Sequence, residues 1–358
     1  MAKEKKTDHE STDFTKSFPV EEQKISTTLE ENYMPYAMSV IYSRALPEID
    51  GFKPSHRKLI YTMYKKGLLH GARTKSANVV GETMKLNPHG DQAIYDTMVR
   101  MTRGNATLLH PYVDSKGNFG KRYSRDMACA APRYTEVKLA KICEELVKDL
   151  DKDTVDFVDN YDGSMKEPTL FPVTFPTILV NATQGVAVGM ATNICSFNLN
   201  EICNAACAVI DNPDADLLTY IQAPDFSTGG IAIYKQKDME KIIETGRGSI
   251  KLRSKYRFDK ANSCIEVYEI PYTTTLEAIM DAVIDLVKSG KIKEITDIRD
   301  ESDKGGLKIT MDVRKNTDPE ALMNRLYTMT PLQENFSCNF NVLIKGRPVV
   351  LGLSLIHI

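Results

Sequence analysis

The stretch of this chain best suited to chemistry runs from Gly117 to Lys138, where Tyr134 directly follows Arg133 in an irregular, basic segment. A free phenol is a weak nucleophile at neutral pH because its pKa is about 10. It becomes effective when cations stabilise the phenolate and the negative charge that builds up during attack on a phosphodiester. Lys121 and Arg122 lie upstream in the same segment and would supply such cations. The pattern therefore indicates a tyrosine able to attack a DNA backbone.

An ordinary structural role is the competing interpretation of this tyrosine. The chain has 16 tyrosines, and one that neighbours an arginine is most often a surface or core residue. The other motifs of the chain must decide between the two interpretations.

A second basic segment opens the helix predicted over 54–68. Pro54 suits the first helical position, an apolar stripe follows it, and Gly67 stops the helix. A helix N-terminus already favours anions through its free N–H groups and its macrodipole. We interpret the first turn as a phosphate site, with a solvated charged turn as the alternative. Its basic residues are His56, Arg57 and Lys58.

Composition excludes several classes of protein. The 358 residues suffice for two or three domains, and 42% hydrophobic with 26% charged residues is typical of a globular protein. No apolar run approaches the ~18–20 residues of a membrane span, and the N-terminus lacks the apolar core of a secretory signal. The seven cysteines are scattered without a CxxC pair, which indicates reduced thiols in a cytosolic protein.

Charge is distributed unevenly along the chain. Residues 44–138 hold 17 Lys and Arg against 8 Asp and Glu, although the whole chain has a net charge of −2. The remainder is therefore acidic. A basic segment in an otherwise acidic chain predicts a surface directed at a polyanion.

Short helices surround the basic segments. A helix is expected from Leu29 to about Arg44, and two more, over 76–84 and 92–102, are joined by a turn that reads LNPHGD. This pair fits a helix-turn-helix, whose second helix would enter the major groove of DNA. Directly after Tyr134, the pattern predicts an amphipathic helix over 135–150.

From about residue 162 strands and helices alternate. The predicted fold class is α+β: a helical winged-helix DNA-binding domain of the helix-turn-helix, CAP-like type, followed by an α/β domain. Residues 353–358 read LSLIHI, which a sequencing adapter would also encode, so we expect them to carry no biology. The predicted helices of this part span 199–210 and 275–288, and the strands lie near 229–234, 249–256, 264–270, 292–299 and 307–313. The predicted divisions are a disordered tail over 1–28, the first domain over 29–161, the second over 162–340 and the start of a truncated C-terminal part over 341–352.

Eleven motifs in one register carry a family resemblance. They include YAMSVIYSRALP (36–47), DGFKPSHRKLIYTM (50–63), NPHGDQAIYDTMVRM (87–101), GNFG (117–120), APRYTE (131–136), LVNATQGVAVGMATNI (179–194), RDESDKGG (299–306) and LYTMTPLQENF (326–336). In this order they resemble the breakage–reunion part of the A subunit of bacterial type IIA topoisomerases, which comprise DNA gyrase and topoisomerase IV. The resemblance covers about residues 30–350 and implies an N-terminal fragment of such a subunit, with the α/β domain as its tower.

The resemblance implies a role for each residue of the site. Tyr134 would attack a DNA phosphodiester and become a transient 5′-phosphotyrosyl ester, and Arg133 would stabilise the pentavalent charge. Phe175 holds the position of an apolar residue, usually Ile, that wedges between base pairs; a core Phe is the alternative. Asn87 stands where the family often has His, so it carries no charge there. The residues expected to contact DNA are Arg44, Lys53, His56, Arg57, Lys58, His89, Lys121, Arg122 and Phe175.

Two further positions concern inhibitors of the family. Gln92 and Asp96 occupy the helix positions where quinolones usually anchor, through a Ser or Thr and an acidic residue. Gln92 departs from that pattern. The resemblance therefore implies reduced sensitivity to fluoroquinolones.

Partners and cofactors also follow from the resemblance. The family is ATP-hydrolysing and acts on double-stranded DNA as an A2B2 heterotetramer, with ATP and Mg²⁺ held by the B subunit. We find no acidic cluster fit for the metal and no P-loop in this chain, so we expect no metal site of its own, no membrane contact and a cytoplasmic, nucleoid-associated location. Gyrase and topoisomerase IV are not distinguished. A winged-helix DNA-binding protein without catalysis and a metal-dependent nuclease are the alternative functions.

Overall fold

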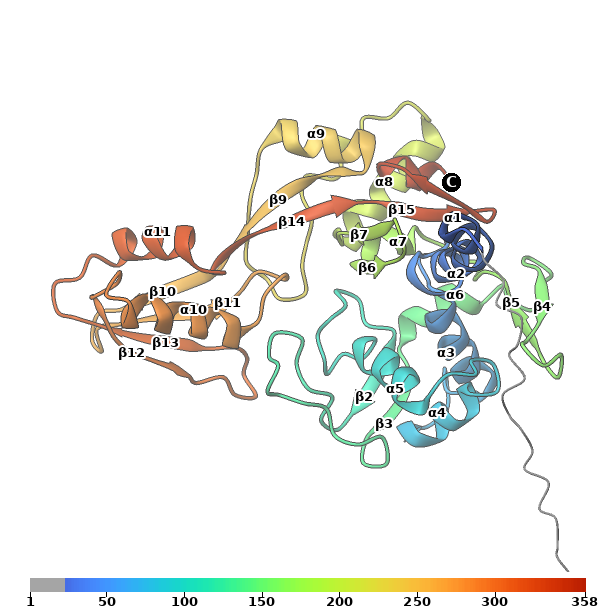
Figure 1. Ribbon diagram of the computed structural model, residues 1–358, viewed down its shortest axis with the longest axis horizontal. Coiled ribbons are helices and arrows are strands. Elements are labelled where there is room, and N and C mark those ends of the chain that lie inside the picture. The colour runs from blue at the N-terminus through green and yellow to red at the C-terminus, as the bar shows by residue number, and fades with distance from the viewer. Residues whose placement is uncertain (1–22) are drawn as a thin grey trace, which may run out of the picture.

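The structure, a computed structural model, describes residues 23–358 (Figure 1). Helices and strands are mixed along the chain in an α+β architecture, as the sequence predicts. Figure 1 shows a broad inner body on the right and a narrower outer body on the left (residues 254–332), joined by the long strands β9 (Arg247–Arg253) and β14 (Gln333–Asn339). Three large apolar cores fill these bodies. No helix of the described residues is long and apolar enough to cross a membrane.

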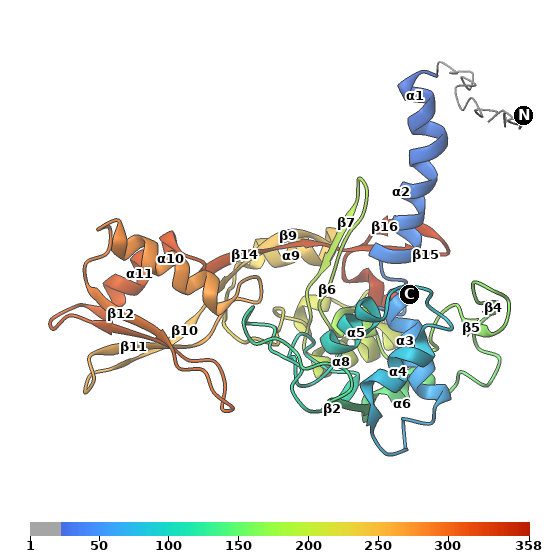
Figure 2. The same cartoon turned by 60° about the horizontal axis from the view of Figure 1, so that its bottom comes forward.

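The N-terminal helical run stands away from the inner body (Figure 2). It begins at Ile25, earlier than predicted, and continues to Ala45 with two π-helical stretches. Most of the predicted disordered tail, residues 1–22, lies outside the described residues. At the inner end of the run Ile41 packs against Leu343. The run comprises α1 (Ile25–Thr28), η1 (Leu29–Tyr33), α2 (Met34–Val40) and η2 (Ile41–Ala45).

Three helices and a small antiparallel sheet form the first core. Pro54 opens α3, whose buried face includes Leu59, Ile60 and Met63. The sheet has the order β1–β3–β2. The helices predicted over 54–68, 76–84 and 92–102 are confirmed. The elements of this part are α3 (Pro54–Lys65), β1 (Thr74–Lys75), α4 (Ser76–Thr83), α5 (Asp91–Arg100), β2 (Val113–Lys116) and β3 (Glu136–Leu139), followed by the hairpin of β4 (Phe157–Asp159) and β5 (Lys166–Pro168).

The single helix predicted over 135–150 is wrong. Its first residues form strand β3, and only short helical segments follow. Val137 and Leu139 are buried while their neighbours are half-buried, a period of two that suits a sheet. Hydrogen bonding of β3 to β1 and β2 outweighs the helix propensity of this segment. The pattern within the segment carries no information about these partner strands, so it did not predict them. The short segments are η3 (Lys141–Cys143) and α6 (Glu144–Val147).

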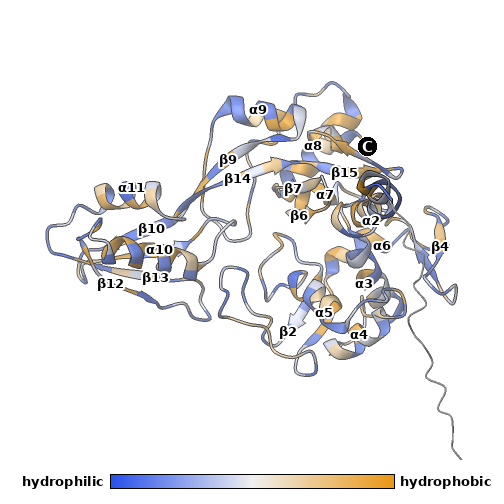
Figure 3. Cartoon of the chain, in the orientation of Figure 1, coloured by the Kyte–Doolittle hydropathy of each residue, from blue (hydrophilic) through white to orange (hydrophobic). Residues whose placement is uncertain are grey.

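A five-stranded sheet with the order β6–β7–β14–β9–β8 builds the second core together with α8 and α9. Strand β14 pairs with β9 from Gln333 opposite Arg253 along its whole length. Figure 3 shows hydrophilic and hydrophobic residues interleaved along α9, as expected for a helix with one buried face. Leu353 and Leu355, near the end of the chain, are buried in this core. The elements are α7 (Thr177–Val180), β6 (Thr183–Val186), β7 (Ala191–Ile194), α8 (Leu199–Asp211), η4 (Leu217–Thr219), β8 (Ile231–Ile233), α9 (Gln236–Thr245), β15 (Asn341–Ile344), β16 (Arg347–Val350) and η5 (Leu353–His357).

The outer body is a four-stranded antiparallel sheet with the order β10–β11–β13–β12, packed against two helices. Ile265, Val267 and Met311 are buried between the sheet and the helices. The strands and the helix predicted for this region are confirmed, whereas α11 was not predicted. The elements are β10 (Lys255–Asp259), β11 (Cys264–Glu269), α10 (Leu276–Lys288), β12 (Ile295–Asp300), β13 (Ile309–Val313) and α11 (Pro319–Met329).

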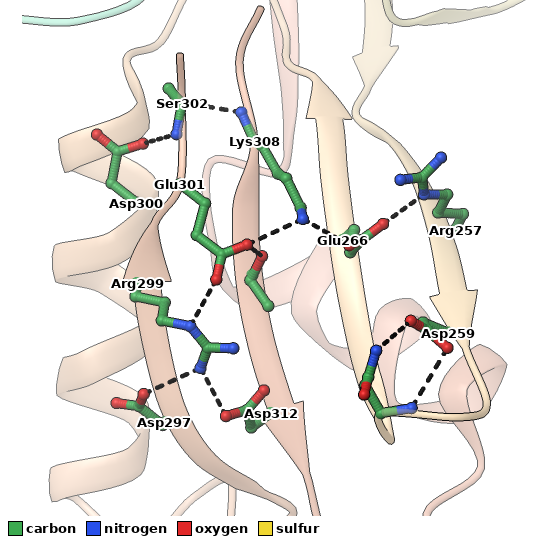
Figure 4. A network of polar contacts seen from close by, with 12 residues as sticks. Arg257, Asp259, Glu266, Asp297, Arg299, Asp300, Glu301, Ser302, Lys308 and Asp312 are labelled. Carbon is green, nitrogen blue, oxygen red and sulfur yellow. Dashed lines mark hydrogen bonds and ion pairs between the residues drawn. The ribbon is translucent and has the colours of Figure 1, made fainter.

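The opposite face of the outer sheet carries a ladder of charged side chains (Figure 4). Lys308 lies 2.8 Å from Glu266 and 2.9 Å from Glu301, and Arg299 lies 2.8 Å from Glu301. The hydrogen bonds from Lys308 and then from Arg299 lower the pKa of the Glu301 carboxyl to about 2. Glu266 is buried, whereas the side chains of Arg299, Glu301 and Lys308 are more than one third exposed, so each pair among these three contributes little to stability by itself.

Candidate active site

Tyr134 projects from the inner body, with 65% of its surface exposed. It lies in a tight turn, in which its backbone N–H donates to the Ala131 carbonyl at 2.9 Å. The guanidinium carbon of Arg133 lies 4.8 Å from the centre of the phenol ring. This cation–π contact keeps a permanent positive charge beside the phenol. The hydroxyl is therefore accessible to a large substrate and has the adjacent cation that the sequence predicts.

Buried hydroxyl groups hold the residues on either side of this turn. The Tyr95 hydroxyl, on α5, donates to the Ala130 carbonyl at 2.6 Å and lies 3.1 Å from the Thr135 hydroxyl. Thr135 is fully buried and donates at 2.7 Å to the hydroxyl of Ser76, which opens α4. The backbone on either side of the exposed tyrosine is thus fixed to two helices, which limits where the turn can present its side chain. Sequence reasoning missed Tyr95 and Ser76, since neither belongs to a local pattern around Tyr134.

The segment that leads to this turn is a compact loop that requires glycine at Gly120. The φ of Gly120 is +66°, in the left-handed region, and a Cβ atom there would collide with the Met127 carbonyl oxygen. Across the base of the loop the Ala130 N–H donates to the Asn118 carbonyl at 2.9 Å, and Phe119 pairs with Cys129. The two sides of the loop therefore form a hairpin-like base close to the Tyr134 turn.

A basic cavity of about 500 Å³ lies between α3, α5 and the segment 181–184. It brings together three of the predicted DNA contacts, Lys53, His56 and Arg122. Arg100 adds a further cation to the cavity. Sequence reasoning missed it, because its position near the end of a predicted helix did not indicate that it would lie beside Lys53 and His56. Neither Arg133 nor Tyr134 lines the cavity. Within one chain, the tyrosine and the basic cavity are therefore separate features.

Burial controls the charge of two groups in this cavity. The pKa of Lys53 is lowered to about 8, first by burial and then by the charge of Arg100, and its ammonium donates to the Gln184 carbonyl at 2.5 Å. The pKa of His56 is lowered to about 3 by burial and by the neighbouring cations Lys53, Arg100 and Arg57. At neutral pH, Lys53 is therefore charged, while the His56 imidazole is neutral and offers a hydrogen bond to a phosphate.

The lowered pKa of Lys53 predicts a pH dependence of DNA binding. Below about pH 8 Lys53 is charged in both the free and the DNA-bound protein, so its contribution is constant. Above that pH the free protein loses the proton while a nearby phosphate retains it, so binding takes up a proton and affinity falls, by at most about tenfold per pH unit. DNA affinity measured from pH 7 to 9 checks this. Lys53→Arg, which stays charged, should flatten the profile; an equal slope in that variant would contradict the assignment.

The basic cluster predicted in the first turn of α3 does not form. Arg57 is buried, and its Nε and Nη2 atoms each donate to Asp50 at 2.8 Å. Lys58 lies 3.3 Å from Glu167. Of the three first-turn residues only His56 lines the basic cavity. Asp50 binds the side chain of Arg57 and Glu167 that of Lys58, so DNA contact by Arg57 and Lys58 stays a prediction.

The remaining predicted DNA contacts are spread over the inner body and its N-terminal helical run. Arg44 is exposed in that run, His89 is exposed in the turn before α5, and Lys121 is half-buried in the loop before Tyr134. Phe175 is half-buried and packs against the first core. None of these four residues lines the basic cavity.

Metal binding is not supported by the described part of the chain. No group of three or more His, Cys, Asp or Glu side chains there is placed to hold a metal ion. The basic cavity has one carboxylate, Asp96, among several cations, which does not fit a divalent metal. No catalytic step is therefore assigned to a metal held by these residues.

Known proteins resemble this chain over most of its length. The family model that describes the A subunit of DNA gyrase/topoisomerase IV matches residues 44–357. The chain is 45% identical to the DNA gyrase A subunit of Mycoplasma genitalium over 337 residues, which cover 92% of this chain and 40% of that protein. For the DNA gyrase A subunit of Halalkalibacterium halodurans the identity is 45% over 342 residues, covering 93% and 41%. For that of Staphylococcus aureus it is 41% over 350 residues, covering 94% and 39%.

The part of the chain that matches these relatives includes the candidate site. The chain spans about two fifths of the length of these relatives. The matched residues include the exposed tyrosine, its adjacent arginine and the basic cavity. The chain belongs to the family of DNA gyrase and topoisomerase IV A subunits.

Proposed function

We propose that the chain is the DNA-cleaving and religating part of an ATP-dependent type IIA DNA topoisomerase, with Tyr134 as the nucleophile. The observation that carries this proposal is an exposed tyrosine beside Arg133 in a member of this family. The Tyr134 hydroxyl oxygen bonds to the phosphorus of a phosphodiester while the bond from phosphorus to the 3′ oxygen breaks. Tyrosine loses a proton and the 3′ oxygen gains one, which leaves a 5′-phosphotyrosyl ester and a free 3′-hydroxyl. Attack of that hydroxyl on the ester reverses the step, so resealing needs no nucleotide.

The chain's own side chains stabilise and position this reaction. Arg133 supplies a fixed positive charge to the pentavalent transition state, where charge is spread over the phosphoryl oxygens. Lys53 and Arg100 in the basic cavity hold the DNA backbone, and the neutral His56 donates a hydrogen bond to it. The remaining residues proposed to contact DNA are Arg44, His89, Lys121 and Arg122.

The fold supports a specific arrangement on DNA. Helices α4 and α5 with the sheet β1–β3–β2 act as a winged helix, with α5 directed at the major groove. Residues 162–340, which include the outer body, act as the tower of the family and support the DNA on either side of the cleavage point. Phe175 is half-buried against the first core and is the residue proposed to wedge between base pairs. Unstacking the base pairs costs a few kcal/mol, which added contacts offset.

Other chains complete the proposed enzyme. Two copies of this chain and two B subunits form an A2B2 assembly in the cytoplasm, on the nucleoid. The B subunit holds Mg²⁺, which stabilises the scissile phosphate, and binds ATP, which drives opening and closing of the DNA gate. Passage of a second DNA duplex through that gate changes the supercoiling or the linkage of the DNA.

End-labelled DNA tests the proposal directly. The protein, together with Mg²⁺ and its B subunit, is incubated with DNA labelled at either end of a cleavage site and then denatured with detergent. We expect protein to remain attached to the 5′ end of the cut strand and the 3′ end to be free. Cleavage without attached protein would support a metal-dependent nuclease, and binding without cleavage would support a DNA-binding protein without catalysis.

Drug sensitivity is predicted to depend on Gln92. Its side-chain amide donates to the Asp96 carboxylate at 2.7 Å across one turn of α5, which occupies both positions where a quinolone would anchor. We expect Gln92→Ser to free Asp96 and to lower the fluoroquinolone concentration needed for half-maximal cleavage-complex formation by roughly tenfold, about 1.4 kcal/mol of binding. Equal sensitivity of the two enzymes would contradict this, and Thr97→Ser on the same helix serves as a control.

A further inference from the structure

The loop before Tyr134 is docked onto the outer body at its apex, residues 121–127. The Leu276 N–H, at the start of α10, donates to the Tyr123 carbonyl at 2.8 Å, and the Tyr123 ring packs against the outer core. The Arg122 guanidinium carbon lies 4.9 Å from the centre of the Tyr272 ring, and its Nη2 donates to the Tyr272 carbonyl at 3.1 Å. Tyr123 therefore attaches the apex to the outer core, whereas Tyr272, the partner of Arg122, packs against the second core. The base of the loop belongs to the inner body.

One carboxylate, Glu277, organises this contact. Its Oε1 accepts hydrogen bonds from the Ser124 hydroxyl and from the backbone N–H groups of Arg125, at 3.0 Å, and Asp126, at 3.3 Å. The side chain of Glu277 is only 12% exposed. Burial tends to raise the pKa of this carboxyl, but the hydrogen bonds from Ser124 and from the Arg125 backbone outweigh it, so the pKa lies below its ordinary value. An ionised carboxylate with three donors from one loop holds that loop in a single conformation.

The apex is connected to the nucleophile by short backbone contacts. The Lys121 N–H donates to the Met127 carbonyl at 3.3 Å, which closes the apex. The paired base of the loop follows, and the Ala130 carbonyl there accepts the hydrogen bond from Tyr95 that holds the Tyr134 turn. A chain of hydrogen bonds therefore connects the apex to the residues that present the tyrosine.

We propose that Glu277 is a positioning residue for DNA cleavage: from the outer body, it holds the loop that presents Tyr134 and so couples the placement of the outer body on DNA to the geometry of attack. The inference rests on the proposed function. Glu277 itself does not touch the reacting atoms. Displacement of a nucleophile by about 1 Å can cost up to roughly 100-fold in rate, so the loss of this contact should be visible in the chemical step.

Single-turnover cleavage measures that step. Each variant is assembled with Mg²⁺ and the B subunit, and covalent complex formation is followed at saturating DNA. For Glu277→Ala we expect the rate to fall by roughly tenfold, with the Kd for DNA nearly unchanged. Glu277→Gln keeps an acceptor oxygen and should lose only about threefold. Asp285→Asn, an exposed acidic position on the same helix, is the control and should behave as the wild type.

A double-mutant cycle separates positioning through this contact from a general structural effect. Ser124→Ala removes one donor from the loop side and remains informative even where Glu277→Ala fails to fold. Ser124 Oγ also accepts hydrogen bonds from the backbone N–H groups of Asp126 and Met127, so Ser124→Ala has a small effect of its own. Because the two side chains share one hydrogen bond, the combined loss of rate should be smaller than the product of the two single losses, whereas independent structural defects would multiply. A normal rate in both single variants, or a parallel loss of DNA affinity, would overturn this inference alone. A wild-type protein that forms no covalent complex would overturn the proposed function as well.

Discussion

Tyr134→Phe is expected to abolish covalent capture of DNA while DNA binding survives. Phe keeps the ring beside Arg133 and removes only the oxygen that would bond to phosphorus. Without a nucleophile, loss of adduct should exceed roughly 1,000-fold, limited by detection. Because the side chain is 65% exposed, stability should change by less than about 0.5 kcal/mol. Detergent-resistant protein on 5′-labelled DNA, with Mg²⁺ and the B subunit present, measures the adduct, and a filter or mobility assay measures binding.

A second exposed tyrosine provides the matched control. Tyr161 is 59% exposed, and Tyr161→Phe should form adduct at the wild-type rate. Adduct formation by Tyr134→Phe would show that another residue is the nucleophile. Loss of DNA binding by Tyr134→Phe would mean that the phenol oxygen contributes to affinity, whereas we expect the basic residues to supply most of it.

Asp50→Asn is expected to cause the largest loss of stability. Asp50 is 1% exposed and accepts hydrogen bonds from the Arg57 guanidinium, from the Phe52 N–H at 3.1 Å and from the Phe171 N–H at 2.9 Å. The amide would leave the buried Arg57 without a counter-charge and would direct N–H groups at donors. Breaking a buried ion pair in this way costs about 3–5 kcal/mol. Urea or guanidinium denaturation, with the slope checked for two-state behaviour, gives the free energy of unfolding.

An exposed ion pair in the same part of the chain gives the comparison. Asp114 lies 2.8 Å from Arg73, and both side chains are about one third exposed. Asp114→Asn should therefore cost no more than about 1 kcal/mol. Equal losses for Asp50→Asn and Asp114→Asn would show that burial of the Asp50–Arg57 pair does not determine its contribution.

Local patterns were sufficient for most helices and for the adjacency of Tyr134 and Arg133. Pro54 and the apolar stripe behind it predicted α3, and the turn before α5 predicted where that helix begins, because capping and helical periodicity act within a few residues. Tyr134 and Arg133 are adjacent in the chain, so their proximity followed from the sequence without knowledge of the fold. The motifs around them were sufficient for the family.

Strand β3 shows where local patterns failed. Val137 and Leu139 suit either a helix face or a strand, and partners on β1 and β2 decide between the two. The long pairing of β14 with β9 likewise joins segments about 80 residues apart, such as Gln333 and Arg253. Sheet hydrogen bonds form between strands, so single-segment propensities do not specify them.

The sequence by itself determined the family and was sufficient to propose the nucleophile and its arginine, because these depend on residue type and adjacency. Tertiary structure decided which of the basic side chains remain charged and free to contact DNA. It buried Arg57 against Asp50, lowered the pKa of Lys53 and His56 by desolvation, and added Arg100 to their cavity. It also brought Glu277 of the outer body onto the loop of Tyr134. Burial, desolvation and such contacts depend on which distant segments meet, and the order of residues along the chain does not reveal this.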